Sequence, residues 1–185
     1  MTKALFLLAD GFEELEFVAP FDILKRGGLT VIVASISDKL QVTSVRNLVV
    51  TADTLLSHVS PDSMDILILP GGGPGTQNLR KSSAVLNILK QHAALQKSIA
   101  AICAAPLVLG DAGLLHGKKV TSFPSTQNEL AKFGALVTQD RVVQDGLIFT
   151  SRGAGSAAEF GFALLAFFTS QNKADEVKTQ MQFAL

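Results

Sequence analysis

Short, almost uninterrupted apolar runs that alternate with helical patterns constrain this chain most. Four such runs are rich in Ile, Val, Leu and Ala: Ala4–Ala9, Leu29–Ile36, Ile66–Leu69 and Ser98–Ile102. Strands that are apolar on both sides are buried on both faces, as in a parallel sheet between two helical layers. Helical patterns at Glu14–Arg26 and Ser83–Leu95 supply crossovers between the runs. The sequence therefore predicts a doubly wound α/β sandwich with a mostly parallel sheet.

Size, charge and cysteine content narrow the class of protein. At 185 residues with 48% hydrophobic residues, the chain predicts one domain over residues 1–185. The formal net charge is zero and there is no basic run, so we expect no nucleic-acid partner. The single cysteine excludes an intrachain disulfide and favours a reducing compartment. Because the sequence contains no signal-peptide pattern and no apolar run long enough for a bilayer, we expect a cytoplasmic protein without a membrane partner.

The remaining segments are less regular. Two short runs near residues 41–51 favour a ribbon, and Asp145-Gly146 favours a hairpin turn. The spacing of Ser156 and Glu159 matches a capping box and predicts a helix to about Thr169. The last pattern, Lys173–Phe183, is typical of a terminal helix.

Three unusual loops follow predicted strands directly. They contain Asp10–Glu16, the glycine run Pro70–Gly75, and Cys103. In an open parallel sheet, ligands bind beyond the carboxyl ends of the strands. We therefore expect all three loops to meet at one edge of the sheet.

Cys103 lies between a predicted strand and a helix-like run that begins at Ala104. The amino end of a helix carries partial positive charge and free amides, which favour the thiolate form of a cysteine. The alternative is a buried cysteine that packs as a small apolar residue. The position at the predicted edge favours a nucleophile.

Two neighbouring features could assist such a thiol. The glycine run allows close backbone approach, and its amides together with that of Ala104 could face an oxyanion; the alternative is a tight turn. Among the four acids between Asp10 and Glu16, we single out Glu16 because it lies among apolar residues. A carboxyl in apolar surroundings has a raised pKa and can act as acid or base. The alternative for these acids is a solvated helix start.

The three histidines are poor partners for Cys103. His116 follows the next helical run and His92 lies late in the preceding one, while His58 is in a connection that we do not place. We expect all three at the surface. The sequence therefore favours a Cys–Glu pair over a Cys–His dyad of the thiol-protease kind.

The motifs now described resemble the ThiJ/PfpI superfamily, in the branch of the Parkinsonism-associated deglycase and bacterial YajL. The matching segments run in family order across nearly the whole chain: Gly11–Glu16, Leu69–Gly72, Ala100–Pro106 and Thr150–Ser156. The resemblance implies a flavodoxin-like, or Rossmann-like, three-layer fold in a single domain. It also implies a homodimer.

The resemblance further implies roles for particular residues. It assigns the nucleophile to Cys103, its carboxyl partner to Glu16, and backbone donors to Gly72 and Ala104. It matches Arg46, and less firmly Arg26, to arginines that reach the neighbouring subunit's site; the alternative for both is solvated surface.

Two departures from the family pattern bear on the chemistry. Many relatives place a histidine where this chain has Phe123, although YajL-like members also lack it. Peptidase-like members have a histidine directly after the cysteine, where this chain has Ala104. The first departure removes a histidine from the family's catalytic proton relay. The second argues against peptidase chemistry and against glutamine amidotransfer, which also needs a histidine.

Three hypotheses follow. The first is a cysteine-dependent enzyme that needs no cofactor or metal and acts on small dicarbonyls or glycated side chains, as a deglycase or by glyoxalase III-type conversion of methylglyoxal to lactate. The second is a non-enzymatic redox sensor or redox-regulated stress chaperone, in which Cys103 is oxidised. A nucleotide or flavin binder is disfavoured, because the chain has no Trp, no Tyr and no phosphate-loop pattern.

Overall fold

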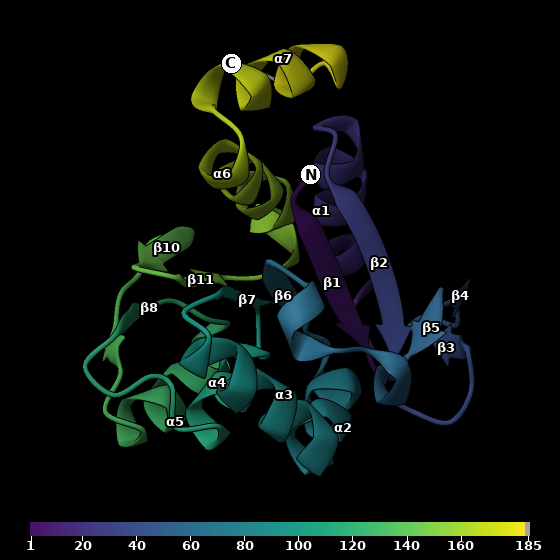
Figure 1. The fold of residues 1–185 in the computed structure, drawn as a ribbon. Coiled ribbons are helices and arrows are strands. Elements are labelled where there is room, and N and C mark those ends of the chain that lie inside the picture. Colours follow the sequence, from purple (N-terminus) through teal and green to yellow (C-terminus); the bar gives the residue numbers. More distant parts are fainter. Residues whose placement is uncertain (184–185) are drawn as a thin grey trace.

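A central sheet of seven strands organises the molecule (Figure 1). The computed structural model describes residues 1–183. The sheet order is β10-β11-β7-β6-β1-β2-β5, and every neighbouring pair is parallel except β10 with β11. The strands are β1 Lys3–Leu8, β2 Thr30–Ser35, β5 Thr54–Leu55, β6 Ile66–Leu69, β7 Ser98–Ile102, β10 Val142–Asp145 and β11 Ile148–Ser151. The predicted fold class is thereby confirmed.

Helices cover both faces of the sheet. The helices are α1 Glu14–Arg26, α2 Gly73–Lys81, α3 Ser83–Ala94, α4 Pro106–Asp111, α5 Gln127–Lys132, α6 Ala157–Phe168 and α7 Gln171–Gln180. Buried side chains of α1 and α6 share one core with alternate strand residues, and those of α3 and α4 share a second core with the rest. In β1, for example, Phe6 faces the first core, whereas Leu5 and Leu7 face the second. This double burial explains why the strands are apolar throughout.

Two small ribbons lie outside the central sheet. β3 Gln41–Thr43 pairs antiparallel with β4 Val49–Thr51, as the sequence predicts, and the short strands β8 Lys119–Val120 and β9 Leu136–Val137 pair in parallel. The β3–β4 ribbon carries the tip Ser44–Asn47 toward the amino end of α1, where the backbone amide of Val45 donates to the carbonyl of Phe12 (2.9 Å).

Three local expectations need correction. The β10–β11 hairpin turns at Gly146-Leu147, one residue later than predicted, because Asp145 pairs with Ile148. Helix α6 does begin after Ser156, but there is no capping box, since Ser156 Oγ bonds to Ser151 and Gly153 instead. The carboxylate of Glu159 binds Arg141.

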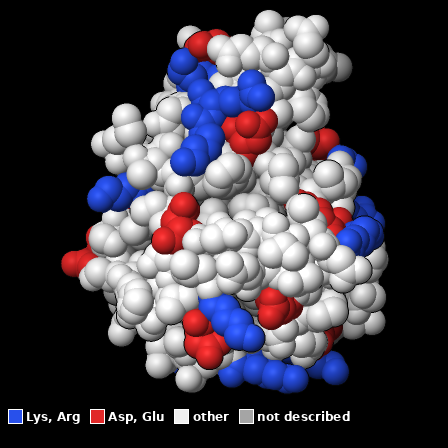
Figure 2. Space-filling view, turned by 90° about the vertical axis from the view of Figure 1, so that its right-hand side faces the viewer, with Lys and Arg blue, Asp and Glu red and all other residues white. Residues whose placement is uncertain are grey.

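The surface is mixed in charge. On the face shown in Figure 2, acidic and basic side chains occur in small groups separated by uncharged areas. Within residues 1–183, no helix is long and apolar enough to cross a membrane.

Candidate active site

Cys103 follows β7 directly and has an unusual backbone. Its φ of 66° lies in the left-handed region, which costs a residue other than glycine on the order of 1–3 kcal/mol. Backbone hydrogen bonds hold it there on both sides: its amide donates to the carbonyl of Ser151 (2.8 Å), and its carbonyl accepts from the amide of Phe123 (2.8 Å). The strained turn aims the thiol across the carboxyl edge of the sheet instead of along β7.

Glu16 reaches the same point from the first turn of α1. Its side chain is buried, with 1% of the residue exposed, and one carboxylate oxygen accepts from the amide of Gly71 (2.9 Å). The thiol of Cys103 is hydrogen-bonded to this carboxyl, and the amide of Ala154 donates to it as well. The predicted partners are therefore in direct contact.

Gly71 lies close to both side chains and has no room for one of its own. A Cβ at this position would lie 2.6 Å from Glu16 Oε2 and 2.8 Å from the Cβ of Cys103. The third close atom is the carbonyl oxygen of Ile102, also at 2.8 Å. Only glycine allows the backbone to lie this close to both the Glu16 carboxyl and Cys103.

The surroundings shift the pKa of Glu16 upward. Burial raises this pKa from the ordinary 4.5 to about 7, and the charge of Glu13 acts in the same direction. The hydrogen bonds from Cys103 and from the amides of Gly71 and Ala154 oppose the rise but do not cancel it. Glu16 is therefore poised to take up or release a proton near neutral pH.

The pKa of Cys103 is raised, not lowered. Burial raises it from 9.0 to about 12, and the charge of Glu16 and the hydrogen bond to it add to the rise. The amides of Gly72 and Ala104 donate to the sulfur and lower the pKa, but by less. The prediction of a low-pKa thiol is therefore wrong, because burial and the adjacent Glu16 carboxyl outweigh the backbone amides that donate to the sulfur. At neutral pH the thiol is therefore protonated, and Glu16 is divided between its ionised and protonated forms.

The predicted backbone donors lie where the sequence suggests. Gly72 has φ 91°, a conformation that suits glycine, and is the residue directly before α2. Its amide and that of Ala104 both reach the sulfur of Cys103. Two amides that converge on a nucleophile can also stabilise an oxyanion formed beside it.

A cavity of about 540 Å³ opens above this pair. It is large enough for a small carbonyl compound or for the end of a modified side chain. Its lining residues come from all three predicted loops, the β3–β4 tip and the segment around α5: Glu13, Glu16, Val45, Arg46, Gly72, Gly73, Pro74, Thr76, Gln77, Cys103, Ala104, Leu107, Phe123, Ser125, Thr126, Glu129 and Ala154.

Comparison with known proteins agrees with this geometry. The model of the DJ-1/PfpI family matches residues 2–167. This chain belongs to the DJ-1/PfpI family. The predicted superfamily is thereby confirmed, and the relatives support the DJ-1-like branch.

Several DJ-1-like relatives match at similar levels. The chain is 38% identical to protein dj-1beta of Drosophila melanogaster, over 95% of this chain and 94% of that protein. It is 40% identical to protein DJ-1 homolog A of Arabidopsis thaliana over 93% of its length, but it spans only 44% of that longer protein. It is 33% identical to a protein named deglycase from Pyrococcus abyssi, over 83% of this chain and 91% of the relative.

Solved DJ-1 structures have the same fold. The structure of oxidized Toxoplasma gondii DJ-1 superimposes with a TM-score of 0.94 at 36% identity, over the full length of both chains. That of Drosophila melanogaster DJ-1beta gives 0.95 at 37% identity, covering 100% of this chain and 99% of the other.

In this DJ-1/PfpI chain, the two predicted arginines lie in different places. Arg46 lines the cavity mouth, where its guanidinium contacts Glu14 (2.9 Å) and Glu13 (3.2 Å). Arg26 pairs with Asp22 in the last turn of α1 (2.8 Å). Ten helical residues separate Arg26 from Glu16, or about 15 Å along the axis, so Arg26 does not reach the site of its own subunit.

A latch fixes the β3–β4 tip to α1. The hydroxyl of Ser44 and the amide of Arg46 donate to Glu14, and these contacts lower the pKa of Glu14 to about 2, with the Ser44 hydroxyl as the main cause. Glu14 therefore stays ionised and serves as a structural anchor. Glu13 caps the helix by accepting from the amide of Glu16 (3.0 Å).

An ion-pair network joins three helices around the cavity. Arg80 of α2 donates to both carboxylate oxygens of Asp111 on α4 (2.6 and 3.1 Å) and to Glu129 on α5 (2.7 Å). These helices follow the loops that hold Gly72, Cys103 and Phe123. The network therefore ties the elements behind the site to one another.

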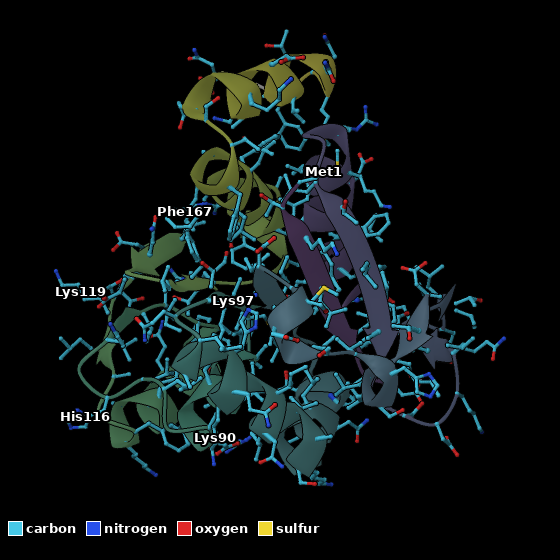
Figure 3. All side chains as sticks on the ribbon, viewed as in Figure 1. Met1, Lys90, Lys97, His116, Lys119 and Phe167 are labelled. Carbon is cyan, nitrogen blue, oxygen red and sulfur yellow. The ribbon has the colours of Figure 1, made fainter. Side chains whose placement is uncertain are left out.

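The histidines take no part in the cavity lining. His58 and His116 are exposed as predicted, and His116 lies at the outer edge of the molecule (Figure 3). The surface prediction is wrong for His92, which is fully buried in α3, because it occupies the helix face that also carries Val85 and Leu89.

Sequence reasoning missed several residues of the site. Gly71 belongs to the matched segment Leu69–Gly72, but no pattern distinguishes it from the other glycines of the run. Ala154 lies within another matched segment, Thr150–Ser156, so the order of motifs could have suggested its contact with Glu16. No pattern pointed to Thr76, whose buried hydroxyl has no hydrogen-bond partner among residues 1–183.

Proposed function

We propose that this protein is a DJ-1-like stress-response enzyme that uses Cys103 and Glu16 on reactive dicarbonyls or on the adducts these form with protein side chains. The observation that carries the proposal is the contact between a buried carboxyl of raised pKa and a strained thiol beneath an open cavity. The relative from Pyrococcus abyssi named a deglycase supports the substrate class.

The first step is formation of a hemithioacetal. Ionised Glu16 accepts the thiol proton as the sulfur of Cys103 attacks the aldehyde carbon of methylglyoxal. The carbonyl oxygen becomes an oxyanion beside the amides of Gly72 and Ala104. Coupling the proton transfer to the attack removes the need for a free thiolate, which the raised thiol pKa disfavours.

The second step moves hydrogen between neighbouring carbons. Glu16 first passes the thiol proton to the oxyanion, which completes the hemithioacetal and leaves Glu16 ionised again. Glu16 then removes the proton from the former aldehyde carbon and returns it to the ketone carbon, while the hydroxyl proton moves to the ketone oxygen through an enediol, which gives a lactyl thioester on Cys103. Water then hydrolyses the thioester to lactate and restores the thiol. The sum is methylglyoxal plus water to lactate, so no external oxidant, reductant or cofactor is required. Deglycation uses the same attack on the carbonyl-derived carbon of an adduct.

The test is turnover of methylglyoxal by purified protein, with lactate as the measured product. Cys103→Ser and Glu16→Gln should reduce the rate by at least a hundredfold, whereas Glu176→Gln, which removes an exposed carboxylate from α7, should leave it unchanged. Normal turnover by Cys103→Ser would exclude the mechanism.

A redox role of Cys103 is the second candidate, and a specific comparison favours it. One solved relative, the DJ-1 of Toxoplasma gondii, is described as oxidized. Two equivalents of peroxide convert the thiol to a sulfinic acid and release two waters. A protonated Glu16 would donate a hydrogen bond to the sulfinate, and redox-regulated chaperone activity is the associated function. Mass spectrometry after mild peroxide should show a stable gain of two oxygens; direct progress to three oxygens, or none, opposes this role.

We further propose a homodimer through the apolar surface beside Arg46. Leu15 and Val18 of α1 are exposed there, as are three side chains of the β3–β4 ribbon: Val45, Leu48 and Val49. The Glu14 latch holds these two elements together, and a shared hollow contains both Leu15 and Leu48. A second copy would cover this surface and approach Arg46. Sedimentation of the wild type should give a dimer, and Val49→Asp should weaken it.

A further inference from the structure

A second cavity of about 380 Å³ lies beside the site and has no part in the chemistry described above. Its lining is Phe123, Pro124, Arg141, Arg152 and residues 153–156. It shares Phe123 and Ala154 with the first cavity. The backbone of Cys103 is hydrogen-bonded both to Phe123 and to Ser151, the residue before Arg152. The two cavities are therefore adjacent, and Phe123 and Ala154 line both of them beside Cys103.

The second cavity is positively charged. Two arginines line it, and its lining contains no carboxylate. The charge of Arg141 is neutralised, because its guanidinium donates to both carboxylate oxygens of Glu159 (2.9 and 2.7 Å). It also donates to the carbonyl of Gly155. Arg152 donates only to the carbonyl of Gln139 (3.2 Å), and among residues 1–183 no carboxylate lies within ion-pair distance of it. One guanidinium charge is left without a counterion.

Internal hydrogen bonds hold the loop that carries Arg152 in one conformation. Ser151 Oγ and Ser156 Oγ are hydrogen-bonded to each other (2.8 Å), and Ser156 also contacts the amide and the carbonyl of Gly153 (3.2 and 2.9 Å). Such a loop is ordered before any ligand arrives, so binding costs little conformational entropy.

We propose that Arg152 and the second cavity bind an oxyanion group, carboxylate or phosphate, of a substrate whose carbonyl carbon reacts at Cys103. The guanidinium fork suits the planar, bidentate geometry of carboxylate and phosphate oxygens. The proposal rests on the proposed function and narrows its substrate class to anionic dicarbonyls and anionic adducts. It makes Arg152 a specificity-determining residue.

The kinetic test compares a neutral with an anionic dicarbonyl. Methylglyoxal is the neutral substrate, and 4,5-dioxopentanoate carries the same ketoaldehyde with a carboxylate at the far end. Arg152→Gln should reduce kcat/KM for the anionic compound by about 10- to 100-fold and change that for methylglyoxal by less than about threefold. Lys90→Gln, which removes an exposed cation from α3 (Figure 3), should affect neither. Equal losses for both compounds in Arg152→Gln, or no loss for either, would overturn the proposal.

A binding test separates this proposal from the proposed function. Inorganic phosphate and acetate are titrated by calorimetry into Cys103→Ser protein, which has no reactive thiol. At least one should bind, and binding should weaken about tenfold or more with Arg152→Gln, partly recover with Arg152→Lys, and fall with added salt. If the wild type does not turn over methylglyoxal, the proposed function fails while this titration still decides the cavity. Absence of binding, or binding that Arg152→Gln leaves unchanged, would refute the anion site.

Discussion

Replacing Glu16 by glutamine should stabilise the folded protein above neutral pH while abolishing turnover. Glu16 is 1% exposed, and its pKa rises from 4.5 to about 7 on folding. One pKa unit corresponds to about 1.4 kcal/mol, so ionised Glu16 costs the folded state about 3 kcal/mol. Because the folded pKa is the higher one, the stability contributed by protonated Glu16 is complete below pH 4.5 and is lost as pH rises through about 7.

The assay is urea unfolding of wild type and Glu16→Gln between pH 4.5 and pH 8. Glutamine keeps an acceptor for the amide of Gly71 but cannot ionise, so the variant should gain about 3 kcal/mol relative to wild type across this interval. Glu176→Gln is the control, since its exposed carboxylate should give a difference that changes little with pH. A pH-independent difference, or one that grows toward low pH, would refute the account of Glu16.

Three further substitutions test the packing around the site. Gly71→Ala should reduce turnover more than tenfold and destabilise the fold by about 1–3 kcal/mol, because its Cβ would clash with the Glu16 carboxyl. Gly73→Ala is the control and should be tolerated, since a Cβ at Gly73 would meet open space. Equal shifts of the melting temperature in the two variants would contradict this account. Thr76→Val should raise the free energy of unfolding by about 1 kcal/mol, since it removes a buried hydroxyl that has no hydrogen-bond partner among residues 1–183. A urea titration in which the variant is less stable than wild type would argue against this prediction. Arg80→Gln should lower the unfolding free energy by about 1–2 kcal/mol, and the loss should shrink in high salt if the ion-pair network is its cause.

The sheet could be predicted from the sequence because both of its faces are covered. Strands β6 and β7 begin and end where their apolar runs do, since burial on both sides leaves no polar alternation to blur the ends. The short strands β5, β8 and β9 have only two residues each and leave no such signal. Their pairing depends on tertiary contacts that a local pattern does not contain.

The contact between Cys103 and Glu16 could also be anticipated, because topology brings the carboxyl ends of parallel strands to one edge. Their pKa values could not, since these depend on how completely the loops bury both groups. The amides of Gly72 and Ala104 do lower the pKa of Cys103, but burial and the adjacent Glu16 carboxyl raise it by more.

The hydrogen-bond partners of individual side chains are also difficult to predict from the sequence. Ser156 and Glu159 have capping-box spacing, yet each side chain is hydrogen-bonded to a residue outside that motif. Ser156 bonds to Ser151, and Glu159 accepts from Arg141. The second cavity is equally invisible in the sequence, because Arg141 and Arg152 meet only when β10 pairs with β11.

The pH dependence of methylglyoxal conversion tests the central claim most directly. If Glu16 accepts the proton of Cys103 during attack, kcat/KM should rise with pH through about 7, as Glu16 ionises, and then stay level to pH 9. A rate that instead follows ionisation of an ordinary thiol, and still climbs between pH 8 and 9, would contradict the coupled pair.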